Sequence, residues 1–356
     1  MTESQWLKAA DGDAMLAVVQ DRLSPRKWTL LACGVAHRLS DLLPPGLFPD
    51  AIRWAEDTAG RLVPDSVRST WDRRLVDESF NVIAGVERRQ RDIVHVCDPD
   101  ADDRQYQDES ERRVNPAVPL YQEASRAAAH SIEAAGRTAQ VATDAVRLLV
   151  REPGPVLADL RRRTVDAQEG AATAGLRAAL ALELFAKAND VADKGQVKNP
   201  RLERSRAMET IHRLQEHADT RYVALSGQKS RADRKALGKL LLEQLGNLFR
   251  PYRFNPRWRT EAVVGIARAI DEDRAVERYP ILLDALLDAD CDEEDILRHV
   301  RGTEPHHPHP THAVGCWVLD LILQKDEPLY ARPPLKSTKS GSGPGMQLGL
   351  AEGPLV

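Results

Sequence analysis

Two stretches of small and apolar residues, each repeating in steps of four and three, constrain this chain more than any other feature. The first stretch runs through Tyr121, Ser125, Ala128, Ile132, Ala135, Ala139, Ala142, Val146 and Leu149. The second runs through Leu157, Leu160, Thr164, Ala167, Ala171, Ala174, Ala178, Ala181, Phe185 and Ala188. Such alternation averages about 3.5 residues per turn and keeps one face of a helix against a partner helix.

The sequence REPGP at 151–155 separates the two stretches, and its two prolines and one glycine cannot continue a helix. Two helices joined by such a turn form an antiparallel hairpin, about 45 Å long at about 1.5 Å per residue. Alanine along the contact lets the two axes approach closely. We therefore predict a coiled helical hairpin over 119–192, with two ordinary helices of a globular bundle as the alternative.

The rest of the chain also shows helical patterns, and 92–97 (DIVHVC) is the only short strand candidate. Thr2 with Gln5, and Ser24 with Pro25, are typical of helix starts. We predict an all-α protein, a helical bundle platform that carries the Ala-rich hairpin. Its other parts are a helical block at 1–96, an acidic linker or loop at 97–118, a C-terminal helical block at 201–327 that packs with the first, and a disordered Gly/Pro/Ser-rich tail at 328–356.

Composition and charge restrict the environment and the partners. The 356 residues carry a formal net charge of −4, so we do not expect the whole chain to bind a polyanion such as nucleic acid. Four scattered cysteines without a CxxC motif fit a reducing cytoplasm. We expect no signal peptide and no membrane-spanning helix, because the chain shows neither a basic start followed by an apolar run nor a long apolar stretch.

Two blocks of sequence resemble a large family of uncharacterised helical proteins expanded in planctomycetes. The N-terminal block is MTESQWLKAADGDAML with SPRKWTLLACGVAHR. The C-terminal block contains GNLFRP at 246–251 and GCWVLDLIL at 315–323. The resemblance implies a helical fold in which the two blocks flank a variable, often Ala-rich helical insert and pack into one domain. It implies no reaction.

The same resemblance bears on HHPHPTH at 306–312. His299 and His312 match the two histidines of the family, which are usually separated by a shorter segment. The histidines between them, His306, His307 and His309, therefore lie in what resembles an insertion. The family's cysteine after the first histidine is Val300 here, which puts a metal site built on such cysteines in doubt.

Imidazoles bind zinc, nickel or copper, so His306, His307, His309 and His312 are candidate metal ligands. However, Pro305, Pro308 and Pro310 hold this segment extended, and alternate side chains then point apart, whereas a closed site needs convergent ligands. We interpret the segment as a surface loop and expect no cofactor, with zinc or another transition metal as the alternative.

Two further patterns could bind metal or perform chemistry. Cys33 and His37 share one helical face and could meet His312 or Cys316, but we favour a buried structural cysteine and a surface histidine. The acidic stretch 98–109 has carboxylates at the positions of a calcium loop, but Asp103 stands where that loop needs glycine. We interpret this stretch as a linker.

Two patterns could bind a macromolecule. Arg250, Arg257 and Arg259 alternate with aromatic residues, which is typical of nucleic-acid contacts and also of a structural turn. We favour the turn. In the tail, Gln347, Leu348 and Leu350 resemble the short peptide with which bacterial proteins dock on the DNA sliding clamp, but Ala351 replaces the bulky residue that usually follows.

We favour a non-catalytic protein-interaction, scaffold or adaptor protein whose partner is another protein. The alternative is an enzyme whose site gathers His299, His312, Cys316 and Asp320, since a Cys-His pair with a carboxylate can act as a nucleophile. No Gly-rich phosphate loop, nucleophile elbow or HExxH motif supports the enzyme. A metal- or nucleic-acid-associated binding protein is a further alternative.

Overall fold

The computed structural model shows an all-α protein, as predicted, and every regular element among the described residues is a helix. The described residues are 1–43, 46–97, 117–151, 156–193, 200–250, 252, 254–302, 314–325 and 333–336. In that part of the chain no helix is long and apolar enough to cross a membrane.

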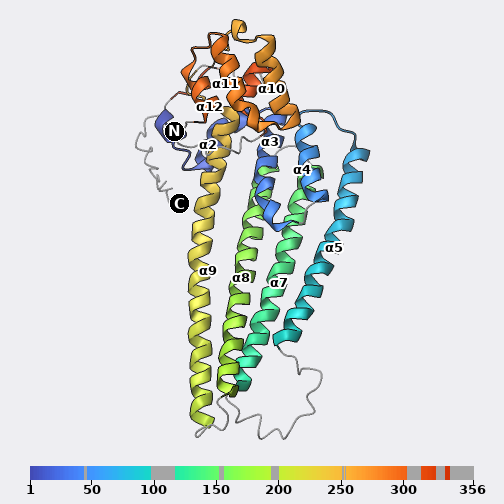
Figure 1. The fold of residues 1–356 in the computed structure, drawn as a ribbon, viewed down its shortest axis with the longest axis vertical. Helices are drawn as coiled ribbons and strands as arrows, with labels where there is room; N and C mark the ends of the chain where they lie inside the picture. The colour runs from blue at the N-terminus through green and yellow to red at the C-terminus, as the bar shows by residue number, and fades with distance from the viewer. Residues whose placement is uncertain are drawn as a thin grey trace, which may run out of the picture.

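Four long helices lie side by side and form a stalk (Figure 1). They are α5 (Asp65–Cys97), α7 (Ala117–Arg151), α8 (Leu157–Asp193) and α9 (Pro200–Leu245). A head of shorter elements sits at one end of the stalk. It consists of α1 (Glu3–Leu7), α2 (Gly12–Val19), η1 (Gln20–Arg22), α3 (Pro25–Ala36), η2 (His37–Leu42), α4 (Leu47–Asp57), η3 (Pro256–Trp258), α10 (Glu261–Asp273), η4 (Val276–Arg278), α11 (Tyr279–Asp288), α12 (Glu294–Arg301) and α13 (Trp317–Ile322).

The predicted antiparallel hairpin of α7 and α8 is confirmed. The two helices approach so closely that a Cβ atom on Gly170 would lie 2.3 Å from Thr138 Oγ1. The spacing pattern predicts the contact well near the turn, where Ala142, Val146 and Leu160 are fully buried. Nearer the middle of the helices, several of the predicted contact alanines are only half-buried, namely Ala135, Ala171, Ala174 and Ala178.

Other helices cover both ends of the hairpin. Its turn end is built into the head, where Val150 and Leu157 join a core cluster with α3 and α4. Its open end is covered by α9, whose Ala207 and Ile211 pack on α7 and α8, and α5 packs along α7. A hairpin rich in alanine buries little apolar area per residue, so the added helices supply the missing burial.

Two sequence-based boundaries are wrong. The basic segment 226–235 (SGQKSRADRK), whose composition predicts a connector between two helices, lies within the 46 residues of α9. The strand candidate 92–97 lies within α5. Neither segment contains proline, and a single glycine in a helix is destabilising by only about 1 kcal/mol relative to alanine, so packing on either side carries α9 across the first segment.

The predicted acidic linker lies largely outside the described residues, as does most of the predicted tail. The part of the tail that is described, 333–336, lies against the head. Leu335 N donates a hydrogen bond to Leu248 O at 2.8 Å, and Arg22 Nη1 donates one to Pro333 O at 2.8 Å. The backbone of this short stretch therefore has hydrogen-bond partners in both terminal blocks.

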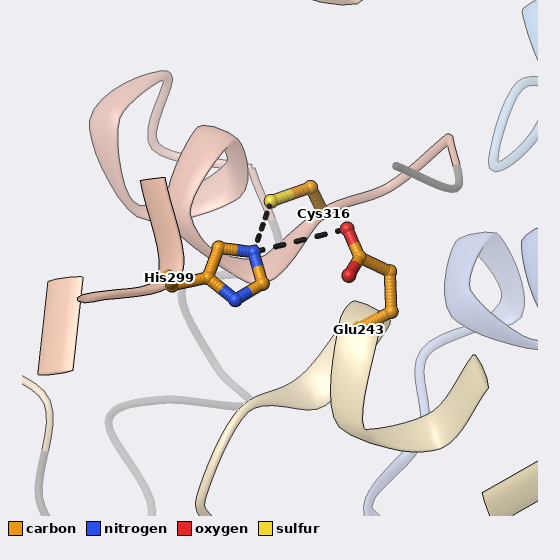
Figure 2. A group of neighbouring side chains, drawn as sticks. All are labelled: Glu243, His299 and Cys316. Atoms are coloured by element: carbon orange, nitrogen blue, oxygen red, sulfur yellow. Dashed lines mark hydrogen bonds and ion pairs between the residues drawn. The ribbon is translucent and has the colours of Figure 1, made fainter. Parts of the chain in front are cut away.

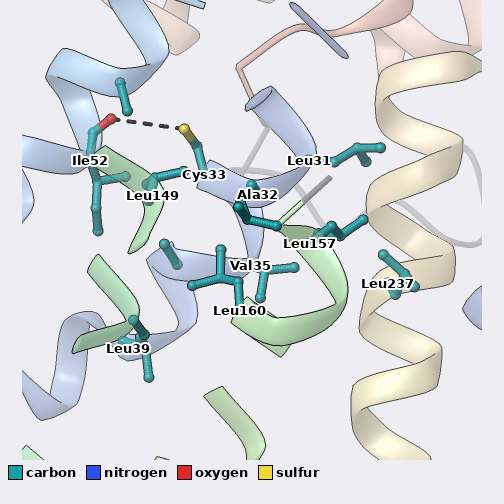
Figure 3. Close-up of a cluster of buried hydrophobic side chains, with 14 of the residues drawn as sticks. Leu31, Ala32, Cys33, Val35, Leu39, Ile52, Leu149, Leu157, Leu160 and Leu237 are labelled. Atoms are coloured by element: carbon teal, nitrogen blue, oxygen red, sulfur yellow. Dashed lines mark hydrogen bonds between the residues drawn. The ribbon is translucent and has the colours of Figure 1, made fainter. Parts of the chain in front are cut away.

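The N-terminal helices pack directly on the C-terminal segments. Leu31 shares one core cluster with Leu157 and Leu237 (Figure 3). Trp6 Nε1 donates a hydrogen bond to Gly246 O at 2.9 Å across the end of α9. The helix starts are as predicted: Thr2 and Gln5 form a capping box, and Ser24 caps α3.

Candidate functional site

Three side chains that could bind a metal or react meet in the head (Figure 2). Glu243 comes from the last turn of α9, His299 from α12, and Cys316 from the residue that precedes α13. All three are buried, and the His299 and Cys316 side chains have no exposed surface. Only two of them, His299 and Cys316, are among the residues predicted from the sequence.

The ends of the helices explain how these residues meet. α9 stops at Gly246, which adopts φ +67°, a conformation that favours glycine. A Cβ atom at Gly246 would lie 2.9 Å from the Trp317 ring, so this glycine also lets Trp317 lie over the end of α9. Cys316, immediately before Trp317, is thereby held beside the last turn of α9, which carries Glu243.

The hydrogen bonds within the cluster fix the proton on His299. Trp317 Nε1 donates to His299 Nδ1 at 3.1 Å. A neutral imidazole carries one proton, so the proton lies on Nε2 when Nδ1 is an acceptor. Nε2 lies 3.1 Å from Cys316 Sγ and 3.8 Å from Glu243 Oε1. The Nε2–H group therefore donates a hydrogen bond to the sulfur, and the Glu243 carboxylate lies slightly farther from Nε2.

This arrangement opposes nucleophilic chemistry by Cys316. A thiolate–imidazolium pair needs a second proton on His299, and that proton would occupy Nδ1, where it would face the Trp317 N–H group. The sulfur is also fully buried, out of reach of a substrate. Burial likewise raises the pKa of the Tyr279 hydroxyl well above its ordinary value, so Tyr279 keeps its proton.

Asp320 belongs to a different interaction. Its Oδ2 lies 2.6 Å from Lys27 Nζ and 2.9 Å from Arg26 Nη1. Lys27 Nζ also donates to Gln244 O at 2.5 Å and to Gly315 O at 2.7 Å. The lysine, fully buried, therefore joins α3 to the end of α9 and the start of α13, and Asp320 is the counter-ion that makes this possible.

The predicted four-residue enzyme site is thus divided. His299 and Cys316 are in contact, Asp320 is paired with Lys27, and His312 lies outside the described residues. Glu243 is not among the residues predicted from the sequence. One sequence pattern does point to Glu243, because this acidic residue stands in the run LLLEQLGN, where the neighbouring leucines predict burial. A buried carboxylate requires a partner.

The cluster has the spacing of a metal site. One ligand atom from each of Glu243, His299 and Cys316 lies within 4.8 Å of the other two. With these separations, the three atoms lie on a circle with a radius of about 2.4 Å at most, and zinc bonds to such ligands measure about 2.0–2.3 Å. Zinc would need the lone pair of Nε2, so the proton would have to move to Nδ1 and the Trp317 hydrogen bond would break.

Binding a metal at this cluster would break one buried hydrogen bond. Losing one buried hydrogen bond costs about 1–3 kcal/mol. Structural zinc binds zinc-finger peptides with about 10–16 kcal/mol near neutral pH.

The other sequence candidates do not join this cluster. Cys33 Sγ faces Ile52 O, and His37 Nε2 lies 2.7 Å from Glu56 Oε1, both at the contact of α3, η2 and α4. Arg250 pairs with Glu3, and Arg259 donates to the carbonyl of Leu321, so these two arginines hold the fold together. The candidates that lie outside the described residues are His306, His307, His309, the calcium-like loop 98–109, and Gln347, Leu348 and Leu350.

Because of the buried Cys33 thiol, we expect the protein to lose stability at alkaline pH. Burial, followed by the charge of Glu56, raises the pKa of its thiol well above the ordinary value of 9.0. The unfolded thiol loses its proton above about pH 9 while the folded thiol keeps it, so the free energy of unfolding falls as pH rises. We expect Cys33→Ala to make the urea midpoint fall less steeply between about pH 8 and about pH 10. Identical slopes for the variant and the parent would contradict this.

Comparison with known proteins finds no matching family model, no matching curated protein and no matching solved structure. The resemblance to the planctomycete helical proteins stays a prediction. The function is therefore argued from the geometry.

Proposed function

We propose that this protein is a non-catalytic adaptor that binds another protein in a groove on its stalk. The geometry of the reactive residues supports this, because His299, Cys316 and Asp320 are buried and engaged with one another or with Lys27. A cytoplasmic location suits such a protein, since its cysteines then stay reduced. The observation that carries the proposal is the groove.

The groove lies between η2, α5, α7 and α8 and has a volume of about 600 Å³. Its floor is formed by the half-buried alanines of the hairpin, and its walls come from η2 and α5. The lining residues are Asp41, Leu42, Leu43, Glu78, Asn81, Val82, Gly85, Ala135, Thr138, Ala139, Ala171 and Ala174. Small residues hollow the groove out, and most of its lining is apolar, so burying an apolar side chain there is favourable.

Charge defines the kind of partner. Asp41 and Glu78 carry the negative charge of the groove, and neither has an ion-pair partner among the described residues. Asn81 Nδ2 donates to Glu78 Oε2 at 3.2 Å, which leaves the carboxylate charge in place. A partner segment with apolar side chains between lysines or arginines complements this surface. An amphipathic helix that lays its apolar face into the groove satisfies both conditions.

Two synthetic peptides test the proposal on the full-length protein. Both are amphipathic helices with leucine at i, i+3, i+4 and i+7, one with lysine and one with glutamate at the polar positions. We expect the lysine peptide to bind, as measured by fluorescence anisotropy, and the glutamate peptide not to bind. Ala171→Trp, which fills the groove, should weaken binding at least about tenfold.

Matched variants control the experiment. Ala179→Trp adds the same bulk to an exposed position of α8 outside the groove and should bind as the parent does. Asp41→Lys with Glu78→Lys should weaken binding, whereas Asp77→Lys, at an exposed position next to Glu78 but outside the groove, should have a smaller effect. Equal binding of the two peptides, or equal loss in the groove and control variants, would refute the groove as the binding site.

A further inference from the structure

We propose that Glu243, His299 and Cys316 form a buried structural site for a divalent transition ion with affinity for thiolate, of which zinc is the reference case. The site is independent of the groove and of the proposed partner. It also differs from the His-rich segment 306–312, where the sequence alone placed the candidate metal ligands.

The chemistry of the three donors supports this choice of ion. Sulfur, imidazole nitrogen and carboxylate oxygen are the ligands that zinc takes in proteins, whereas calcium and magnesium take oxygen alone. A divalent ion bound to one thiolate and one carboxylate has no net charge. Neutrality matters here, because the cluster is buried and an uncompensated charge would be strongly unfavourable.

The protons balance without another reactant. On binding, the Cys316 thiol releases its proton to solvent, and the sulfur bonds to the metal. The single proton of His299 moves from Nε2 to Nδ1, and Nε2 bonds to the metal. Two N–H groups then face each other across the 3.1 Å between Nδ1 and Trp317 Nε1, so the indole must turn away. Binding at this site therefore changes the environment of Trp317.

The position of the ligands indicates a structural role. They come from the end of α9, from α12 and from the start of α13, so one ion would fasten the stalk to the C-terminal part of the head. The Tyr279 hydroxyl from α11 is hydrogen-bonded to Cys316 and adds a fourth polar group to the cluster. Closed surroundings are typical of structural rather than catalytic zinc.

The test measures metal content and spectra of the full-length protein. After refolding with zinc and dialysis, we expect about one zinc ion per chain by elemental analysis. Cobalt(II) in place of zinc should give a sulfur-to-metal charge-transfer band in the near ultraviolet. Loading should change the tryptophan emission, and Trp317→Phe should remove most of that change.

Variants assign the ion to its site. Cys316→Ser and Glu243→Gln should each weaken zinc binding at least about tenfold, and Cys316→Ser should remove the cobalt band. Cys291→Ser alters another buried cysteine of the head and should keep both the metal and the band. His306→Ala, His307→Ala and His309→Ala combined should also keep both.

Three results would overturn the proposal. One is a refolded parent protein without stoichiometric zinc or a cobalt band. Another is zinc that persists in Cys316→Ser and Glu243→Gln but disappears from the triple histidine variant, which would place the ion in the His-rich segment. The last is metal loading that leaves the Trp317 emission unchanged. Glu243→Gln keeps the shape of the side chain, so it remains informative if Cys316→Ser fails to fold.

Discussion

Lys27→Met should destabilise the protein by about 3–5 kcal/mol, more than any other single change that we consider. Methionine keeps the length and the apolar stem of the side chain, so packing is nearly preserved. The loss comes from three acceptors that the ammonium group now satisfies, namely Asp320 Oδ2, Gln244 O and Gly315 O. Gln244 O and Gly315 O would lose this donor while remaining buried, and Asp320 Oδ2 would keep only Arg26 as its partner, so the change is costly.

Arg26→Met is the matched control, since Arg26 also contacts Asp320 but its side chain is 18% exposed. We expect it to cost about 1 kcal/mol, because Lys27 still neutralises Asp320 and solvent partly screens the lost pair. Lys27→Met combined with Asp320→Asn should recover part of the loss, because the uncompensated charge disappears. Urea denaturation measures all three. A loss below about 1 kcal/mol in Lys27→Met, or no recovery in the double variant, would show that the buried pair does not hold the blocks together.

The role of Lys27 illustrates what the sequence alone could not show. It follows a helix start signal, Ser24 with Pro25, and a lysine in that position is ordinarily solvated. Its burial depends on Gly315 and Asp320, which lie almost 300 residues further along the chain. Local patterns such as caps and periodicity depend on residues that are close in the sequence. They therefore predict the start of the helix but not the partners of the Lys27 side chain.

Only part of the candidate site could be predicted from the sequence, because its residues also come from distant parts of the chain. His299 and Cys316 were selected as reactive residue types near each other in the C-terminal block, and they are in contact. Asp320 was added because it stands four residues after Cys316, as if both lay on one helical face. However, Cys316 is the residue that caps α13, and Lys27 and Arg26 hold the Asp320 carboxylate in an ion pair of its own. Glu243 occupies the place beside His299 that was assigned to Asp320.

The hairpin could be predicted because its signal is local and repeated. Each helix shows the alternating pattern over many turns, and the prolines and glycine at 151–155 allow only one way to join them. The pattern cannot tell which part of the contact face meets further helices. Ala142 is fully buried by the head, whereas Ala171, at an equivalent position of the pattern, lines the groove and stays half-buried. The spacing pattern does not distinguish the two alanines, although only Ala142 is fully buried in the structure.

The different burial of Ala142 and Ala171 leads to the second prediction of a large effect on stability. Ala142→Leu should destabilise the protein by about 1–3 kcal/mol, because the added atoms enter a cluster shared by α3, α7 and α8 and must displace neighbours. Ala171→Leu makes the same substitution where the groove offers space, and it should change the free energy of unfolding by about 0.5 kcal/mol or less. Urea denaturation of both variants beside the parent measures the contrast. Similar losses at the two positions would mean that the groove is closed in solution, and neutral effects at both would mean that the buried contact of the hairpin lies on another face.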